Sequence, residues 1–278
     1  KSATPAQEPP PPDLPQRPPG RSGTFTTSII ARNGTHNIAL YMTSWQHAGE
    51  NLTDVLARRS ADLAAPIQMS DALSRNMPEG LNTIVANCLA HARREFVDLV
   101  EIFPAACRHV LEQLAIVYQN DASARTNNLS PEDRLALHRD HSAPVMETLK
   151  AWMKEQIDQR LVEPNSTLGK AIAYMGKHWD ALTLFLHQPG APLDNNICER
   201  ALKMAILNRK NAMFFRTVRG ARVADTFMSI IQTAKLAGKN VLHYLVATLS
   251  NPERIAANPE QWMPWNYEQT QLALAAPS

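Results

Sequence analysis

The sequence has few cysteines, no long apolar run and almost no net charge, and each shortage excludes a class of protein. Its three cysteines among 278 residues are widely spaced, which fits reduced thiols and provides neither a disulfide framework nor a zinc quartet. No apolar run approaches about 18 residues and no signal-peptide pattern is present, so we expect no membrane span, no export and a cytoplasmic location. The formal net charge of +2 excludes a uniformly basic nucleic-acid coat.

The composition that remains is that of a globular protein, since 44% of the residues are apolar and can build a sizeable core. Residues 1–22 are rich in proline and are expected to form a disordered arm. After them, Thr24–Ala31 and His36–Thr43 have the β-branched residues and the alternation of strands. Asn33 and Gly34 suit both centres of a two-residue turn, so the pattern predicts an antiparallel hairpin.

A mixed α/β pattern follows the hairpin. Apolar residues at helical spacing predict a helix over 49–59, and short strands are predicted at 66–70 and 83–88. From 89 to about 186 the pattern is helical and no further strand is indicated. The fold class is therefore α/β with a large all-helical block.

The last part of the chain is also predicted to be helical. One helix opens near Asp194, and two more are expected over 223–237 and 241–249. Trp262 and Trp265 are expected to anchor the tail on the domain. The predicted organisation is an arm (1–22), core strands with a helix (23–88), a helical insertion (89–190), a basic helical part (191–249) and a tail (250–278).

Two carboxylates stand out as candidates for chemistry. Asp71 comes just after a predicted strand, where α/β sheets present functional side chains, although an aspartate there is also an ordinary loop starter. Glu199 lies near the start of a helix, one turn after Asn195 and Asn196. Because Asn196 and Glu199 have the spacing of a capping box, a simple capping role for Glu199 remains an alternative.

Positive charge is concentrated after Glu199. Residues 199–222 hold seven cations against that one carboxylate, namely Arg200, Lys203, Arg209, Lys210, Arg216, Arg219 and Arg222. Carboxylates that hold Mg²⁺ and cations that hold phosphates are the two halves of a phosphoryl-transfer site. A solvated basic face is the alternative interpretation.

A further pair, Cys88 and His91, has Cys-x-x-His spacing. With no second pair at zinc spacing this is a weak metal signal, and most such pairs are structural. At a strand-to-helix junction, His91 could hydrogen-bond near the functional edge of the sheet, while Cys88 would be a small buried hydrophobe.

Several segments resemble one family of transposases. They are PLDNNICERALKMAILNRKNAMFF, IVANCLAHARREF, HAGENLTDVLARR followed by PIQMSDALSRN, and WMPWNY. These segments are similar to transposases of the insertion sequence 66 family, and the resemblance runs from about Ser22 to about Tyr267. It implies an RNase H-like fold with a DDE site, in which three acidic residues bind two Mg²⁺ ions for DNA strand cleavage and transfer.

The resemblance also implies roles for individual residues. Asp71 matches the second acid and Glu199 the third, both as metal ligands, and the helical block between them resembles an insertion domain. Supporting roles are implied for four neighbours, Cys88, His91, Asn195 and Asn196. The basic positions are implied to contact the DNA backbone, namely Arg200, Lys203, Arg209, Lys210, Arg216, Arg219 and Arg222.

One part of the family pattern is missing from this sequence. The family carries its first acid in an Asp-Asp-Thr-like motif upstream of the Phe25–Thr27 strand, and no such motif occurs here. Asp13 is no substitute, because the prolines around it cannot donate to a central strand. We therefore expect an incomplete RNase H-like sheet without its first strand, and a fragment that is inactive by itself.

The partners expected from the resemblance are double-stranded DNA at the element ends and the target, further copies of the transposase in a homo-oligomer, and accessory proteins of the element. The location expected is the bacterial cytoplasm, with association to the nucleoid during action. An alternative function is a non-catalytic DNA-binding or regulatory remnant that uses residues 199–222. A third is a stand-alone nuclease, which needs another acid such as Asp54 or Asp225, both on predicted helices.

Overall fold

The computed structural model describes residues 19–21, 23–211, 215 and 217–275. The chain divides into two compact units. The first combines Lys1–Asp54 with Ile197–Ser278, and the second is Val55–Asn196. Nearly all of the proline-rich arm predicted at 1–22 lies outside the described residues.

The first unit is built around an antiparallel hairpin, as predicted. Strands β1 (Phe25–Asn33) and β2 (His36–Ser44) pair over their whole length. The predicted turn is wrong by one residue, because Asn33 pairs with His36 and the turn centres are Gly34 and Thr35. Gly34 has a φ of 58° and Thr35 does not have a positive φ. A positive φ at the first centre alone is the pattern of a type II′ turn, in which glycine takes that place.

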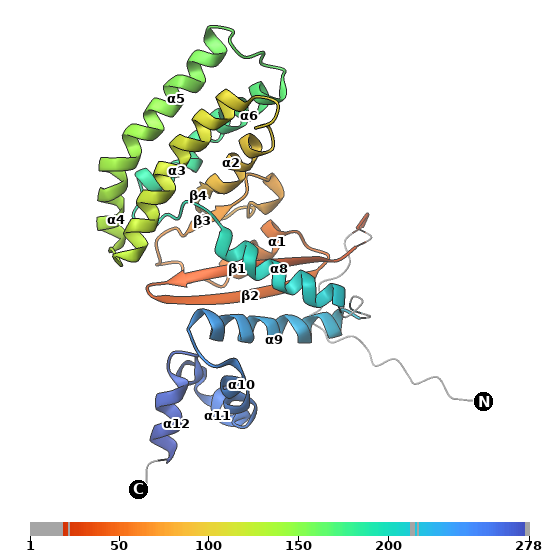
Figure 1. The fold of residues 1–278 in the computed structure, drawn as a ribbon. Coiled ribbons are helices and arrows are strands. Elements are labelled where there is room, and N and C mark those ends of the chain that lie inside the picture. Colours follow the sequence, from red (N-terminus) through yellow and green to blue (C-terminus); the bar gives the residue numbers. More distant parts are fainter. Residues whose placement is uncertain (1–18, 22, 212–214, 216, 276–278) are drawn as a thin grey trace, which may run out of the picture. The chain divides into compact units, whose positions relative to one another are not determined.

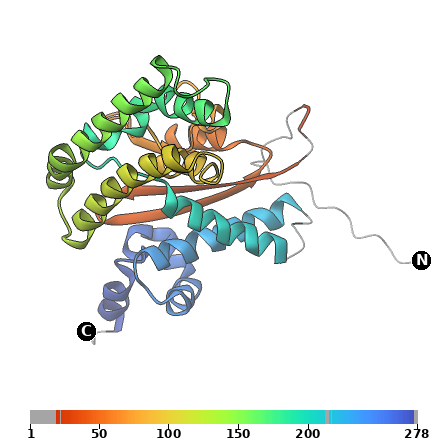
Figure 2. The same ribbon diagram turned by 45° about the horizontal axis from the view of Figure 1, so that its top comes forward.

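Helix α9 (Val218–Leu236) lies alongside the hairpin (Figures 1 and 2). Alternate amides along β2 donate to side chains one turn apart on the helix: Ala39 to Thr233 (3.1 Å), Tyr41 to Ser229 (3.0 Å) and Thr43 to Asp225 (2.6 Å). Four helical residues rise about 6 Å and two strand residues about 6.7 Å, so the two spacings nearly match. The helix side chains thus satisfy the outer edge of β2, where another strand would otherwise pair.

Helix α8 (Asn196–Asn211) packs on the same hairpin through small residues. Ala201 and Ala205 are buried with Ala39 and Tyr41, and the Tyr41 hydroxyl donates to the carbonyl of Ala201 at 2.8 Å. Because alanine side chains are short, the helix can approach the hairpin closely.

Helix α1 (Ala48–Leu56) ends three residues before the predicted end. Its Asn51 is 2% exposed and donates to Thr27 Oγ1 at 2.8 Å, which ties the helix to β1. Helix α9 begins five residues before its predicted start, because Thr217 Oγ1 accepts from the Gly220 amide at 3.0 Å and caps it there.

Three helices complete this unit, α10 (Val241–Leu249), α11 (Pro252–Ala257) and α12 (Tyr267–Ala275). The bounds of α10 agree with the prediction. The predicted anchoring by tryptophan is confirmed, since Trp262 is 3% exposed and its carbonyl accepts from Tyr244 Oη at 2.8 Å. Trp265 stacks on His36 with 4.1 Å between ring centroids.

The second unit combines a short parallel pair with a bundle of helices. Strands β3 (Ile67–Ser70) and β4 (Ile84–Asn87) are parallel, with Ser70 paired to Asn87. Both short strands were predicted. A 3₁₀ turn, Ser74–Asn76, lies in the connection between them.

The predicted all-helical block is confirmed. Its helices are α2 (Leu89–Val97), α3 (Pro104–Thr126), α4 (Pro131–Leu137), α5 (Ala143–Asp158), α6 (Thr167–Lys177) and α7 (Trp179–Leu182), with a π-helical turn at His138–Ser142 and a 3₁₀ turn at Leu184–Leu186. Their apolar faces share one core, in which Phe96, Leu114 and Met146 are fully buried. Figure 1 shows the long helices α3 and α5 of this unit.

The described residues therefore form a helix-rich mixed α/β protein with two small two-stranded sheets. This agrees with the α/β class predicted from the sequence. Whether the sheet is RNase H-like stays a prediction. Within the described part of the chain, no helix is both long enough and apolar enough to cross a lipid bilayer.

Candidate functional site

The carboxyl ends of β3 and β4 bring predicted site residues together. Asp71 follows Ser70 and Cys88 follows Asn87, and these strand residues are paired in the parallel register. The amide of Cys88 donates to the carbonyl of Ser70 at 2.9 Å. Asp71 and Cys88 thus lie at one edge of the pair, which is the edge where parallel sheets place functional groups.

Asp71 is half-buried and held by a neighbour. Its Oδ1 accepts a hydrogen bond from the side-chain amide of Asn76, which belongs to the 3₁₀ turn after β3. This hydrogen bond fixes the rotamer of the Asp71 side chain. The second carboxylate oxygen, Oδ2, can still accept a hydrogen bond or a metal ion.

Cys88 is the N-cap residue of α2 and is 1% exposed. Burial raises the pKa of its thiol, although amides of Asn195, His91 and Ala90 hydrogen-bond to the sulfur and partly oppose the shift. The thiol is therefore a small buried group, as predicted. His91 is half-buried in the first turn of α2, where its amide donates to the Cys88 carbonyl at 3.2 Å.

The loop before α8 is attached to the same edge. The carbonyl of Leu193 accepts from the amide of Leu89 at 2.9 Å, which fixes the loop at the start of α2. Asp194 Oδ1 then accepts from the Asn196 amide at 3.1 Å and caps the beginning of α8. Within the described residues, the side-chain oxygen of Asn195 is buried without a hydrogen-bond partner. The loop therefore brings Asn195 to Cys88 at the edge of β3 and β4, and Asn196 follows it as the first residue of α8.

Helix α6 and the residue that follows it contribute Tyr174 and His178 to this edge, and the sequence analysis identified neither. His178 Nδ1 lies 3.3 Å from the side-chain amide of Asn87, the last residue of β4. Burial and the charge of Lys177 lower the pKa of His178. Burial, followed by the charges of Glu95 and Asp71, raises the pKa of Tyr174.

Helix α3 contributes Tyr118 in the same way. Burial raises the pKa of its hydroxyl, with smaller contributions from Asp194 and Cys88. No local pattern marks these three as site residues, because Tyr118 and Tyr174 lie on ordinary helices and His178 lies between α6 and α7, all far along the chain from β4. Only the packing of the helices on the sheet brings them there.

Glu199 belongs to the first compact unit, which resumes at Ile197, whereas Asn196 is the last residue of the second unit. It is half-buried in the first turn of α8. The residue before it, Cys198, donates from its sulfur to the carbonyl of Ser28 at 3.0 Å, so this turn of α8 is fixed against β1.

The predicted basic residues differ in exposure. Four of them are exposed, namely Arg200, Lys203 and Lys210 on α8 and Arg219 on α9. Arg222 is half-buried, and Arg216 lies outside the described residues. Arg209 is half-buried and donates from Nη1 to Thr26 Oγ1 at 3.2 Å, so it takes part in holding α8 on the hairpin.

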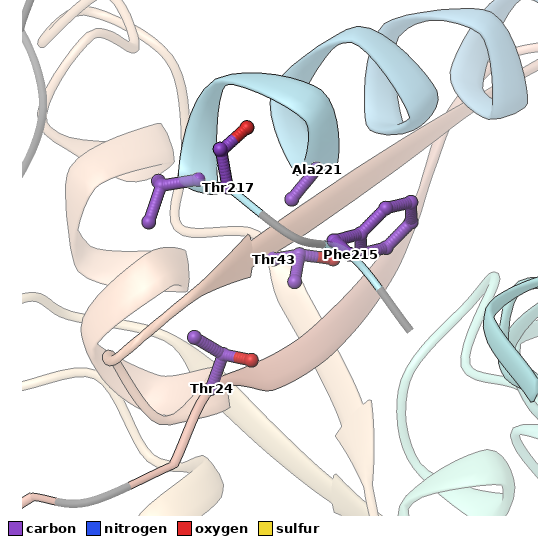
Figure 3. Close-up of a pocket in the computed structure, with 6 residues that line it drawn as sticks. Thr24, Thr43, Phe215, Thr217 and Ala221 are labelled. Atoms are coloured by element: carbon purple, nitrogen blue, oxygen red, sulfur yellow. The ribbon is translucent and has the colours of Figure 1, made fainter. Parts of the chain in front are cut away.

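A pocket of about 180 Å³ lies beside the first turn of α9. Figure 3 shows Thr24, Thr43 and Thr217 around it, together with Phe215 and Ala221. Val218 completes the lining. Three of the six lining residues are thus threonines, and the pocket lies where α9 begins.

The acids that a stand-alone nuclease would need are placed unfavourably for metal binding. Asp225 is 8% exposed, and both of its carboxylate oxygens accept hydrogen bonds from Thr43. Asp54 is an exposed residue of α1 that accepts from Gln46 Nε2 at 2.9 Å. Among the described residues, neither acid belongs to a close group of three or more potential metal ligands.

Comparison with known proteins gives one family. The family model described as the transposase IS66 family matches residues 19–223. The chain is 33% identical to the uncharacterized protein y4jD of Sinorhizobium fredii over 268 residues, which is 93% of this chain and 48% of the relative. It is 29% identical to the uncharacterized proteins y4hP and y4qI of the same organism, over 206 and 188 residues.

The chain spans only part of these relatives. The match to y4hP includes 68% of this chain and 36% of the relative. The match to y4qI includes 66% of this chain and 34% of the relative. The share of each relative is therefore about half or less. No solved structure matches the chain.

Proposed function

The chain belongs to the transposase IS66 family, and from that membership we propose that it is part of the core of a DNA transposase that cleaves and transfers DNA strands. The observation that carries this proposal is the extent of the family match. Residues 19–223 include Asp71, Glu199 and helix α8 with its cations. The proposed acids and the proposed DNA contacts thus lie within one region typical of the family.

We propose an RNase H-like fold for this core. An antiparallel hairpin and a parallel pair that ends in an acid are elements such a fold contains, and both occur here. The helices between β4 and α8 would then be an insertion into it. The proposal assigns two acids of the DDE site, Asp71 and Glu199, to this chain.

The proposed cofactor is Mg²⁺, and the chemistry of the two side chains fits it. Carboxylate oxygens are the hard ligands that Mg²⁺ prefers, and Asn76 already orients the Asp71 carboxylate. When bound, the ion would activate a water or hydroxyl and stabilise the leaving oxygen of a phosphodiester. Asp71 and Glu199 would hold it, and Asn76 would keep Asp71 in one rotamer.

The proposed partner is double-stranded DNA at the element ends and the target, bound by a homo-oligomer. Lys203 and Lys210 on α8 and Arg219 on α9 are exposed and can neutralise phosphates without reading bases. Their exposure also favours the second candidate function, a non-catalytic DNA-binding or regulatory role, because phosphate binding needs no acid.

DNA binding by the purified chain is the first test. We expect the logarithm of the binding constant to fall linearly with the logarithm of the salt concentration, by about 0.9 per phosphate contact. Lys203→Gln and Lys210→Gln should each remove one phosphate contact and so reduce the magnitude of that slope by about 0.9. Lys154→Gln is the matched control, since Lys154 is 76% exposed on α5 and paired with Asp158. Absence of DNA binding, or binding without a salt slope, would overturn the proposed function.

Divalent-ion binding is the second test. We expect Mn²⁺ binding, followed by water proton relaxation, to weaken in Asp71→Asn and in Glu199→Gln. The control Asp98→Asn changes an exposed carboxylate of the second unit and should bind as the wild type does. If all four proteins bind Mn²⁺ alike while the salt slope persists, the metal assignment is wrong and the DNA-binding role remains.

A further inference from the structure

A line of hydrogen bonds crosses the hairpin from α8 to α9. Arg209 Nη1 donates to Thr26 Oγ1 at 3.2 Å, and Thr26 Oγ1 lies 3.1 Å from Thr43 Oγ1. Thr43 Oγ1 lies 2.8 Å from Asp225 Oδ1, and the Thr43 amide donates to Asp225 Oδ2 at 2.6 Å. Four residues from four elements, α8, β1, β2 and α9, are thereby connected within the first unit.

The direction of donation along this line follows from the number of protons. A carboxylate can only accept, so the single hydroxyl proton of Thr43 goes to Asp225. Thr26 must then donate its own proton to Thr43, and its oxygen accepts from Arg209. Each hydroxyl gives one hydrogen bond and receives one, and a guanidinium and a carboxylate close the two ends.

The hairpin geometry explains why these two threonines can connect two helices. Thr26 and Thr43 are direct partners in the antiparallel register. Because the Thr43 amide points outward to α9, this pair is not hydrogen-bonded through the backbone, and in such pairs the side chains approach most closely. Thr43 is 4% exposed and Asp225 is 8% exposed, so water does not compete for the bonds nearest the carboxylate.

We propose that Arg209 is a positioning residue rather than a phosphate contact, and that it fixes helix α8 relative to helix α9 through Thr26, Thr43 and Asp225. This rests on the proposed function, because the two helices carry the exposed cations assigned to DNA. The relay keeps Lys203 and Lys210 at a set spacing from Arg219. The same carboxylate is the first of the three α9 side chains that cap β2, so the relay and the seating of α9 share Asp225.

The first experiment compares salt slopes of DNA binding. Arg209→Gln and Lys210→Gln remove the same charge from adjacent residues of α8. We expect Arg209→Gln to weaken binding several-fold with an unchanged slope, and Lys210→Gln to reduce the slope by about 0.9. A reduced slope in Arg209→Gln would identify a phosphate contact and overturn the proposal.

The second experiment needs no DNA and therefore separates the relay from the proposed function. Arg209→Gln should lower Tm by about 2–4 °C in the wild-type background. That loss should largely disappear in Thr43→Val, which lacks the hydroxyl, and return in Thr43→Ser, which keeps it. Thr226→Val is the matched control, since Thr226 is an exposed residue of α9. If the Tm losses of Arg209→Gln and Thr43→Val are additive, the relay does not exist.

Protonation of the carboxylate gives a readout that simple packing would not. The groups that face Asp225 are Thr43 from β2 and Arg222 from its own helix, with Arg209 behind Thr26. A protonated Asp225 has a proton of its own to give to Thr43, so the order of donation is no longer fixed. The coupling between Arg209 and Thr43 should therefore weaken on acidification, whereas a coupling that is independent of pH would contradict the relay.

Discussion

Among the described residues, each compact unit buries one aspartate on a long helix, Asp121 on α3 and Asp225 on α9. The two carboxylates are held by different kinds of partner. Asp121 is 3% exposed and Asp225 is 8% exposed. Asp121 Oδ1 lies 2.5 Å from Arg134 Nη2 and 3.3 Å from His138 Nε2, and Asp121 Oδ2 lies 3.2 Å from Arg125 Nη2. Asp225 is held by the amide and hydroxyl of Thr43.

Their pKa values shift in opposite directions for this reason. Burial would raise both, because it disfavours the charged form. At Asp121 the hydrogen bond from His138 and the charges of Arg134 and Arg125 outweigh burial and lower the pKa. At Asp225 the hydrogen bonds from Thr43 and the charge of Arg222 do not outweigh it, and the pKa is raised. The partners, more than the depth of burial, decide the state of a buried acid.

The Asp121 cluster also shows why a constellation of residue types is not a site. Asp121 accepts from His138 Nε2, and His138 Nδ1 lies 2.9 Å from the Ser142 hydroxyl. This is the order of groups in a hydrolase triad. Ser142 is 0% exposed and His138 is 1% exposed, however, so no substrate can reach the hydroxyl. The cluster therefore stabilises the π-helical turn at His138–Ser142 and the helices around it.

The largest expected effect comes from removing the charge of Asp121. Asp121→Asn leaves Arg134 and His138 without their anion, and breaking a buried ion pair in this way costs on the order of 3 kcal/mol. Urea unfolding of the chain should show the loss. Asp140→Asn, an exposed acid of the neighbouring turn, is the control and should change stability by less than about 0.5 kcal/mol. Equal effects of the two variants would remove the basis of the comparison.

A smaller effect is expected at Asp225, and it should depend on the substitute. Asp225→Ala leaves the buried Thr43 amide without an acceptor, which costs about 2 kcal/mol. Asp225→Asn keeps an acceptor for that amide and removes a charge that burial disfavours, so its stability at neutral pH should stay within about 1 kcal/mol of the wild type. The same urea measurement applies. A loss as large as that of Asp121→Asn would mean that Asp225 also depends on a charged partner.

Next in size is the loss of one bond between α9 and β2. Thr233→Val removes the oxygen that accepts from the Ala39 amide at 3.1 Å, which costs about 1 kcal/mol. Hydrogen exchange of the Ala39 amide should then quicken by roughly fivefold to tenfold. The Tyr41 amide, which donates to Ser229, is the internal control. Equal acceleration at both amides would indicate that the whole helix detaches.

The smallest expected difference is one of pH dependence. The lowered pKa of Asp121 contributes stability that is present above the unfolded value, near 3.8, and is lost as the pH falls through the folded value. The raised pKa of Asp225 has the opposite sign: its contribution is complete below 3.8 and is lost as the pH rises through the folded value.

Unfolding free energies measured from neutral pH to about pH 3 test both signs. As the pH falls, the unfolding free energy of the wild type should rise relative to that of Asp225→Asn. At the acid end, the wild type should no longer be more stable than Asp121→Asn. Parallel curves for either variant would mean that the corresponding carboxyl has the same pKa in the folded and unfolded chains.

Much of the fold follows from local patterns in the sequence. The alternation of residues 36–43 and the glycine between the strands give the hairpin, and Asn240 before an apolar run gives α10. The predicted turn was wrong by one residue, because Asn-Gly is by itself a favourable pair for the two central positions of a tight turn. The register of the strands places Gly34 and Thr35 at those positions. The start of α9 was placed too late because the cap of Thr217 lies outside its apolar periodicity.

The candidate site was predictable only in part. Asp71, Cys88 and His91 were found because they lie at strand ends or at a strand-to-helix junction, which a sequence can indicate. Tyr118, Tyr174 and His178 were not found, because they lie on or directly after helices whose sequences carry no motif. Arg209 was grouped with the other cations by its charge, although its contact with Thr26 distinguishes it from Lys210, the next residue.

The sequence by itself determined most helices and strands, the resemblance to the family and the residues that could carry chemistry, because these depend on short patterns and on the identity of side chains. Only the tertiary structure decided which polar side chain meets which. Asp225 looks like a free acid in the sequence and becomes the end of a relay in the fold, since its partner Thr43 is separated from it by 182 residues. Contacts of that kind arise when helices pack on a sheet, and no local pattern encodes them.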